Sequence, residues 1–411
     1  MARAALKTLL LITALLLGGA PPAFAGPAGS PRLGLWIECE GAHHTLDDAE
    51  RIAAAVDAAG ALGATDLFVQ VYRNGTAWFP TRLASDAPYA RARARGVDPL
   101  GMTLRLAHAR GLRVHAWVNV LRVDSGERSA LVRALGPEAV LGDETGRPLT
   151  APGPWGSSQN VKPDTPGAWL DPGSPAVAER LSGILGDLLK AYPALDGLHL
   201  DYLRYPMPIS AGSKSRAEVR ELGWTAASRA AFLAATRKAG VEPSRPRWDA
   251  WRRDRLTALL RRLRDVLSSD QRERVLSAAV IPAPREAIDR ALQDWPAWGR
   301  DGLLDVIVPM NYTADPLAFD ALARTDVARR GRAAMLIGVG AWRFADDVAA
   351  IALRVHLARE AGAQGAVLFS HDNLRSETGA FDRLGALLRA ELRTPATSIR
   401  PATTDEALPA P

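Results

Sequence analysis

The chain has 411 residues, more than a single small module needs, and its composition excludes several classes of protein. Hydrophobic residues make up 47% and charged residues 23%, which are globular values and exclude a chain disordered throughout. The single cysteine, Cys39, excludes an intramolecular disulfide framework and a metal site built from several cysteines. The net charge of +6 comes from an arginine-rich composition that is weak evidence for nucleic acid, so we expect no nucleic-acid partner.

The first 25 residues have the layout of a secretory signal peptide. Arg3 and Lys7 give a basic start, an apolar run covers Leu9–Leu17, and Ala23–Ala25 places small residues at the expected cleavage site. Because the apolar run is too short to span a bilayer, we expect cleavage and no integral membrane segment in the mature protein. We therefore expect an extracytoplasmic location, periplasmic or secreted. Thr394–Pro411 is rich in Pro, Ala and Thr without hydrophobic periodicity, which predicts a disordered tail.

Short apolar, β-prone runs alternate with amphipathic stretches between residues 32 and 392. This alternation favours a parallel sheet covered by helices, and eight such units favour closure into a barrel. A doubly wound open sheet is the alternative, but Glu38–Gly41 stands where a glycine-rich phosphate-binding loop would follow the first run. We predict a single (β/α)8 TIM barrel. The expected strands are Leu33–Glu38, Asp66–Tyr72, Leu112–Asn119, Gly197–Asp201, Val275–Ile281, Leu304–Asn311, Met335–Gly340 and Gly365–Ser370.

Two segments are longer than the usual connection after a barrel strand. Val123–Ala168 follows the third expected strand and is rich in Gly and Pro. Leu203–Arg247 follows the fourth and contains a helix-like piece around Arg229–Lys238. Long insertions on this side of a barrel commonly form lids or substrate walls. We therefore expect both insertions to border the functional site.

Alternate side chains of a barrel strand face the interior, so the period of two selects candidate site residues. In Gly197–Asp201 the leucines face the helices, while His199 and Asp201 point inward. The polar inward residues gather at the C-terminal ends of their strands, where barrel enzymes keep their chemistry. The inward or strand-end set is Trp36, Glu38, Glu40, Gln70, Tyr72, His115, Trp117, Asn119, His199, Asp201, Asn311, Trp342 and Asp372.

Several blocks of sequence carry a family signature. Asp196–Pro206 (DGLHLDYLRYP) covers the fourth strand, and Asp98–Leu100 with Ala107–Arg122 covers the third. The other blocks are Asp66–Arg73, Trp295–Trp298 and Val308–Tyr312. Together they resemble the family 10 glycosyl-hydrolase-like proteins, which are extracytoplasmic TIM-barrel proteins, over roughly residues 32–390. The resemblance implies glycoside hydrolysis of a polysaccharide, with bacterial cell-wall glycan or exopolysaccharide as the substrate class.

Two positions depart from the family pattern. Many members carry a second Asp directly after the one that matches Asp201, whereas this chain has Tyr202. The usual Asn-Pro-x-Arg after the third strand is replaced by Asn119–Arg122 (NVLR). The first departure argues against a pair of aspartates at the fourth strand. Glu38 and Glu40 do not map onto the family pattern, so their role rests on geometry alone.

Glycosidic cleavage commonly uses two carboxyl groups, and their separation, about 5 or about 6.5–9.5 Å, decides between retention and inversion. We expect Asp201 and Glu38 to be the catalytic pair, with Glu40, Asp315 and Asp372 as alternatives for the second carboxyl group. The expected substrate-binding residues are Tyr72, Arg73, His115, Trp117, Asn119, Arg122, His199, Arg204, Tyr205, Asn311, Tyr312, Trp342 and Asp372.

Two other functions remain open at this point. A carbohydrate-binding barrel without catalysis would account for the missing second Asp. A metal-dependent deacetylase would use His115, His199, Asp201 and His371, but Glu38–Glu40 stands where metallo-barrels carry His-x-His on the first strand. Both His115 and His199 could equally be hydrogen-bonded structural histidines. We therefore expect no metal and no cofactor.

Overall fold

The computed structural model describes residues 31–123, 129–143, 161–163, 165, 167–210, 222–270, 272–344, 347–375 and 379–393. The expected signal peptide and the expected C-terminal tail lie outside these residues. The described elements begin with a strand at Arg32 and end with a helix at Arg393.

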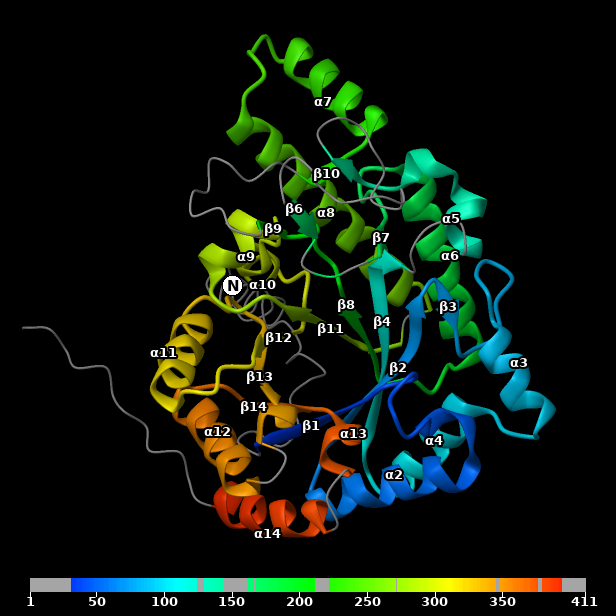
Figure 1. Cartoon of the computed structure of the whole chain (residues 1–411), viewed down its shortest axis with the longest axis vertical. Helices are drawn as coiled ribbons and strands as arrows, with labels where there is room; N and C mark the ends of the chain where they lie inside the picture. Colours follow the sequence, from blue (N-terminus) through cyan, green and yellow to red (C-terminus); the bar gives the residue numbers. More distant parts are fainter. Residues whose placement is uncertain are drawn as a thin grey trace, which may run out of the picture.

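Eight parallel strands form a closed barrel (Figure 1). Each strand pairs with the next in chain order, and the last pairs with the first through Arg32–Gly365 and Leu35–Leu368. The predicted TIM barrel is therefore confirmed, and all eight expected strands are present. They are β1 (Arg32–Ile37), β2 (Asp66–Asn74), β4 (Arg113–Val123), β8 (Gly197–Asp201), β11 (Val275–Val280), β12 (Val306–Asn311), β13 (Ala334–Gly340) and β14 (Gly365–Phe369).

Helices cover the outside of the barrel, and several begin at a side-chain cap. Asp48 accepts hydrogen bonds from the backbone N–H groups of Glu50 and Arg51, and Ser174 accepts one from Val177. No helix within the described ranges has the length and hydropathy needed to cross a bilayer. The barrel helices are α2 (Ala49–Leu62), α3 (Ala87–Ala94), α4 (Pro99–His108), α6 (Pro175–Ala191), α8 (Arg245–Leu267), α9 (Pro284–Arg290), α10 (Trp295–Arg300), α11 (Pro316–Val327), α12 (Val348–Glu360), α13 (His371–Arg375) and α14 (Ala380–Arg393), with the short 3-10 turns η1 (Thr45–Asp47) and η5 (Ala341–Phe344).

The two predicted insertions are present and pair with each other. β5 pairs with β10 and β6 with β9, so strands from the two insertions lie side by side. Figure 1 shows β6, β9 and β10 above the barrel. Asp171, after the first insertion, accepts hydrogen bonds from Thr225 Oγ1 and Ser228 Oγ, both at 2.5 Å, at the start of α7. The insertion elements are α5 (Ala130–Leu135), η3 (Pro137–Ala139), β5 (Gly142–Asp143), β6 (Val161–Pro163), β7 (Ala168–Trp169), β9 (Pro208–Ser210), β10 (Leu222–Trp224) and α7 (Ala226–Lys238).

The hydrophobic core has two parts, one between strands and helices and one inside the barrel. Leu198 and Leu200 of β8 belong to the outer part. His199, between them, lies against the rings of Trp36 and Phe68, which belong to the inner part. The prediction that His199 faces the barrel interior is therefore confirmed. Asp201, two residues later, lies on the same face at the C-terminal end of β8.

Strand β2 breaks its alternation, and one prediction fails there. Gln70 pairs with Trp117 of β4, but Tyr72 pairs with Val118, so the register shifts by one residue between them. This bulge places Tyr72 in the outer core with Val118, where its side chain is fully buried. The prediction that Tyr72 faces the barrel interior and binds substrate is wrong, because the extra residue Val71 turns it to the other face. A two-residue hairpin strand, β3 (Thr76–Ala77), follows β2.

Candidate active site

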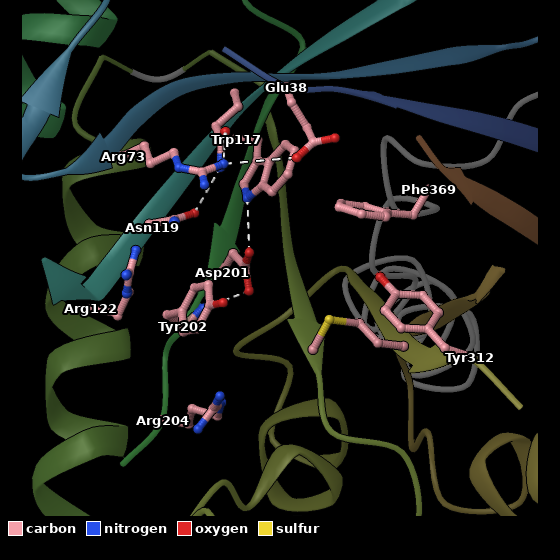
Figure 2. Close-up of a pocket in the computed structure, with 12 residues that line it drawn as sticks. Glu38, Arg73, Trp117, Asn119, Arg122, Asp201, Tyr202, Arg204, Tyr312 and Phe369 are labelled. Atoms are coloured by element: carbon pink, nitrogen blue, oxygen red, sulfur yellow. Dashed lines mark hydrogen bonds and ion pairs between the residues drawn. The ribbon is translucent and has the colours of Figure 1, made fainter. Parts of the chain in front are cut away.

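A cavity of about 240 Å³ lies at the C-terminal end of the barrel strands (Figure 2). Its residues come from strands far apart in sequence, because the C-terminal ends of parallel strands meet at one face of a barrel. The lining residues are Glu38 after β1; Gln70 and Arg73 on β2; Trp117, Asn119 and Arg122 on β4; Asp201, Tyr202 and Arg204 at the end of β8; Met310 and Tyr312 at the end of β12; and Phe369 at the end of β14.

Asp201 is a buried carboxyl group held by two hydrogen bonds. The indole N–H of Trp117 donates to its Oδ2 at 3.1 Å, and the backbone N–H of Tyr202 donates to its Oδ1 at 2.7 Å. Burial raises the pKa of Asp201, and these two donors with the charges of Arg204 and Arg73 offset that rise only in part. Asp201 therefore retains a proton to higher pH than an ordinary aspartate, as a proton donor requires.

Glu38 lies in the same cavity in a different environment. Ser370 Oγ donates to its Oε2 at 2.7 Å, and Arg73 Nη1 lies 3.8 Å from its Oε1. Asn373 Nδ2 in turn donates to Ser370 Oγ at 3.0 Å, which leaves the hydroxyl proton of Ser370 for Glu38. Figure 2 shows the carboxyl groups of Glu38 and Asp201 in the same cavity, with Trp117 close to both.

Amide side chains fix the wall of the cavity beside Glu38. Gln70 Nε2 donates to Asn119 Oδ1 at 3.2 Å, which joins β2 to β4. Gln70 Oε1 accepts hydrogen bonds from Arg73 Nη1 and from the backbone N–H of Cys39, both at 3.4 Å. Arg73 also forms an ion pair with Glu40, its Nε 3.0 Å from Glu40 Oε2. The Arg73 guanidinium is therefore anchored between the amide wall and two glutamates.

Arginines surround the two carboxyl groups. The guanidinium of Arg204 lies over the rings of Trp169 and Tyr202, at 4.9 and 5.3 Å from their centroids, and donates to the backbone oxygen of Tyr205 at 3.1 Å. Arg122 lines the cavity and hydrogen-bonds the side chain of Asn74 on β2. Together with Arg73, these residues make the cavity polar and suited to hydroxyl and anionic groups of a ligand.

A family model described as Glycosyl hydrolase-like 10 matches residues 32–341 of this chain. The chain belongs to this family. The match confirms the resemblance seen in the sequence blocks of the third and fourth strands. It covers seven of the eight barrel strands, all but β14, and most of the cavity residues.

Similar proteins include the glycosyl hydrolase DigH of Escherichia coli strain K12, 27% identical over 307 residues that cover 69% of this chain. The match spans 64% of the length of DigH. The DigH of Escherichia coli O6:H1 strain CFT073 is 25% identical over 309 residues, which cover 69% of this chain and 64% of that protein.

Solved structures share the barrel at lower sequence identity. The glycoside hydrolase domain of PgaB (BpsB) from Bordetella bronchiseptica has a TM-score of 0.62 and 16% identity, covering 87% of this chain and 99% of that domain. The catalytic domain of a β-amylase from Paenibacillus polymyxa has a TM-score of 0.58 and 11% identity, covering 89% of this chain and all of that chain (100%). At these identities the similarity shows the TIM-barrel fold.

The two strand histidines of this glycosyl hydrolase-like 10 protein do not line the cavity. His115 Nε2 lies 2.9 Å from Asp66 Oδ1, at the start of the strands. His199 lies in the barrel interior, its Nε2 accepting from the indole N–H of Trp36 at 3.2 Å and its Nδ1 2.9 Å from Ser277 Oγ. Burial, with the charge of His115, holds the pKa of His199 well below its usual value, so it is neutral. These contacts agree with the alternative that His115 and His199 are hydrogen-bonded structural histidines.

The four residues of the deacetylase alternative do not converge. His115, His199 and Asp201 have the separate partners given above, and His371 lies on α13 with its Nδ1 3.3 Å from Asp372 Oδ1. In the described parts of the chain, no group of three or more His, Cys, Asp or Glu side chains is placed to hold a metal ion. The four residues of this alternative thus lie apart from one another in the part of the chain that the structure describes.

The other candidates for the second carboxyl group lie outside the cavity lining that the described residues form. Glu40 pairs with Arg73 at the surface. Asp315 caps α11 by accepting from the backbone N–H of Ala318 at 2.7 Å. Asp372 accepts from the backbone N–H of His43 at 3.0 Å, and this bond and that from His371 lower its pKa although burial alone would raise it.

Three further predicted binding residues also lie outside this lining. Tyr205 is buried, with the guanidinium of Arg252 5.4 Å from its ring centroid. Asn311 is buried, and its Nδ2 donates to the backbone oxygen of Phe319 at 3.0 Å. Trp342 is exposed on η5, beside the cavity residue Tyr312.

Four lining residues were absent from the predicted binding set: Gln70, Tyr202, Met310 and Phe369. The alternation of side chains along β2 predicted that Gln70 faces the barrel interior. The sequence distinguished Tyr202 only as a departure from the family pattern. Met310 and Phe369 are apolar residues at strand ends, and no sequence signal distinguishes them from core residues. They are found only when the barrel closes and brings β12 and β14 to the same cavity.

Proposed function

We propose that the protein is a glycoside hydrolase that cleaves glycosidic bonds of a polysaccharide, with Asp201 and Glu38 as its two catalytic carboxyl groups. The proposal rests on one observation: the cavity at the barrel mouth holds both groups in opposite environments. Burial raises the pKa of Asp201. Glu38 instead faces the Arg73 guanidinium and accepts from Ser370. Two carboxyl groups in one cavity, one of them a buried group with a raised pKa, form the pattern of a glycosidase acid and its partner carboxylate.

In the proposed reaction, Asp201 donates its proton to the glycosidic oxygen as the bond from that oxygen to the anomeric carbon breaks. Glu38 either attacks the anomeric carbon or takes a proton from the attacking water. Asp201 leaves the bond-breaking step as a carboxylate, which the hydrogen bonds from Trp117 and the Tyr202 backbone stabilise. Water supplies the hydroxyl group of the new reducing end and the proton that restores the acid.

The proposed substrate class is a bacterial cell-wall glycan or exopolysaccharide. The three arginines that line the cavity, Arg73, Arg122 and Arg204, outnumber its two carboxyl groups, which favours a glycan that carries anionic substituents. The predicted N-terminal signal peptide supports an extracytoplasmic site of action, where such polymers occur. The similarity to proteins named glycosyl hydrolase DigH adds support for hydrolysis of a glycan.

The test is hydrolysis of peptidoglycan-derived glycan strands and of exopolysaccharides by the chain without its predicted signal peptide, with products detected by mass spectrometry. We expect shortened oligosaccharides with the unchanged protein and none above background with Asp201→Asn. Equal product release from both proteins would overturn the role of Asp201.

A carbohydrate-binding barrel without catalysis is the second candidate, because Tyr202 occupies the position where many family members have a second Asp. This function predicts that the unchanged protein binds the glycans in calorimetry but releases no products during long incubation. Product release that depends on both Asp201 and Glu38 would exclude it.

A further inference from the structure

The cavity is too small to enclose a polymeric substrate. Its volume of about 240 Å³ lies below the roughly 300–1,000 Å³ of pockets that bury a whole small-molecule ligand. If the substrate is a polysaccharide, as proposed above, most of its sugar units must lie outside the cavity. The surface beside the cavity therefore contributes to substrate binding.

A series of aromatic rings leads from the base of the cavity toward its edge. Trp117, which hydrogen-bonds Asp201, has its ring centroid 6.1 Å from that of Phe369. Phe369 is in turn 5.9 Å from Tyr312, and all three rings line the cavity (Figure 2). The series runs across β4, β14 and β12, which are not consecutive in sequence.

The series continues beyond the cavity to Trp342. Gly340, the last residue of β13, lies between the two outer rings: a Cβ atom placed on it would be 3.1 Å from both Tyr312 Cδ1 and Trp342 Nε1. Any larger residue at this position would press against both side chains. The ring of Tyr312 and the indole of Trp342 therefore both lie against Gly340, at the end of β13.

Trp342 is more exposed to solvent than Trp117, the ring at the other end of the series. Its side chain is 44% exposed, whereas Trp117 is 4% exposed. The guanidinium of Arg343 lies 4.4 Å from the centroid of the Trp342 ring and restrains its orientation. Burial of this exposed ring by a ligand that extends from the cavity would be favourable.

We propose that Trp342 and Tyr312 form a platform on which a sugar ring outside the cavity stacks. The occupant is a pyranose unit of the same glycan whose bond lies between Asp201 and Glu38, so this inference rests on the proposed function. The apolar C–H face of a sugar complements the electron-rich face of an indole. The protein thus binds a glycan chain along the series of rings, and its affinity depends on chain length.

The test measures binding of peptidoglycan glycan-strand fragments of two, four and six sugar units by calorimetry. All variants carry Asp201→Asn so that the fragments stay intact. We expect Trp342→Ala to weaken binding of the longest fragment about tenfold and to leave the shortest unchanged. Trp342→Phe keeps a flat ring and should retain most of the affinity. Leu353→Ala is the matched control, because Leu353 is 41% exposed on α12 and should not affect binding.

Unchanged binding of all fragments by Trp342→Ala would overturn the platform, as would an equal loss for every length. The same variants without Asp201→Asn are assayed for hydrolysis. If the unchanged protein releases no product while the length-dependent loss of binding persists, the proposed hydrolysis fails and the platform stands. If hydrolysis proceeds and binding is independent of Trp342, the platform fails and the hydrolase stands.

Discussion

The base and the mouth of the barrel interior carry the same kinds of side chain and use them differently. At the base, His115 and Asp66 contact each other, and the guanidinium of Arg32 pairs with Asp66. At the mouth, two residues further along β8 than His199, Asp201 lines an open cavity. Both aspartates are buried, yet the pKa of Asp66 is lowered and that of Asp201 is raised.

The difference follows from what surrounds each carboxyl group. Burial raises the pKa of both, but at Asp66 the hydrogen bond and charge of His115, with the charges of Arg32 and Arg113, outweigh it. Asp201 receives neutral N–H donors and more distant arginines, so burial prevails. A carboxyl group satisfied by protein charges stabilises the fold, whereas one that retains its proton beside a cavity is available for chemistry. Burial by itself does not mark function.

The largest expected effect concerns the mouth. Asp201→Asn should reduce glycan hydrolysis by about 10²–10⁴-fold, because the amide cannot donate the required proton. The free energy of unfolding should fall by about 1–3 kcal/mol, because the Asn Oδ1 still accepts from the Tyr202 backbone but the Asn NH₂ cannot accept from the Trp117 indole. Hydrolysis rates and urea unfolding check both statements. Near-normal turnover would show that Asp201, like Asp66, is not required for catalysis.

Asp66→Ala tests the base of the barrel. It leaves His115 and Arg32 buried beside an empty position and should cost about 3–5 kcal/mol of stability, while the folded fraction keeps its activity. Because the folded pKa of Asp66 is lowered, its contribution is present above the unfolded value of about 3.9 and is lost as pH falls below it. Urea unfolding at pH 7 and at pH 3.5 measures this. A loss of activity without a loss of stability would assign Asp66 to the site instead.

Asp326 on α11 is a third buried carboxyl group, and it lies outside the barrel interior. Burial raises its pKa to about 7, and the hydrogen bond from the Ala283 backbone offsets this only in part. Since the folded pKa exceeds the unfolded value, the native state binds the extra proton, and stability falls as pH rises through about 7. We expect a loss of roughly 2–3 kcal/mol between pH 5 and pH 8 that Asp326→Asn removes. Identical pH profiles of unfolding for both proteins would contradict this.

The smallest effect concerns the alignment of Glu38. Ser370→Ala removes the hydroxyl that donates to Glu38 Oε2 and should lower kcat about tenfold with little change in KM. Ser370→Thr keeps the hydroxyl and should restore most of the rate. In a Glu38→Gln background, Ser370→Ala should have little further effect on kcat, because the carboxylate that Ser370 orients is already absent. Additive losses in this double-mutant cycle would show that Ser370 acts elsewhere.

Much of the fold could be predicted from the sequence, because the apolar runs are short, β-prone and separated by amphipathic stretches. All eight strands and both insertions are present where expected. The phase of β8 was also predictable, since its leucines alternate with His199 and Asp201. The outward orientation of Tyr72 was not predictable. It results from the bulge in β2, which depends on how that strand pairs with β4 and not on the amino acids of β2 alone.

The sequence by itself determined the order of strands and helices and the residues at the strand ends, since these follow from local hydrophobic patterning. Its third- and fourth-strand blocks carried the family resemblance. Tertiary structure alone decided which inward groups contact side chains of neighbouring strands and which line a cavity. His115 and His199 each contact a polar side chain on an adjacent strand, while Asp201 and Glu38 face a cavity. The reason is physical: the partner of an inward side chain comes from a neighbouring strand, and only register and barrel closure determine which residue that strand presents.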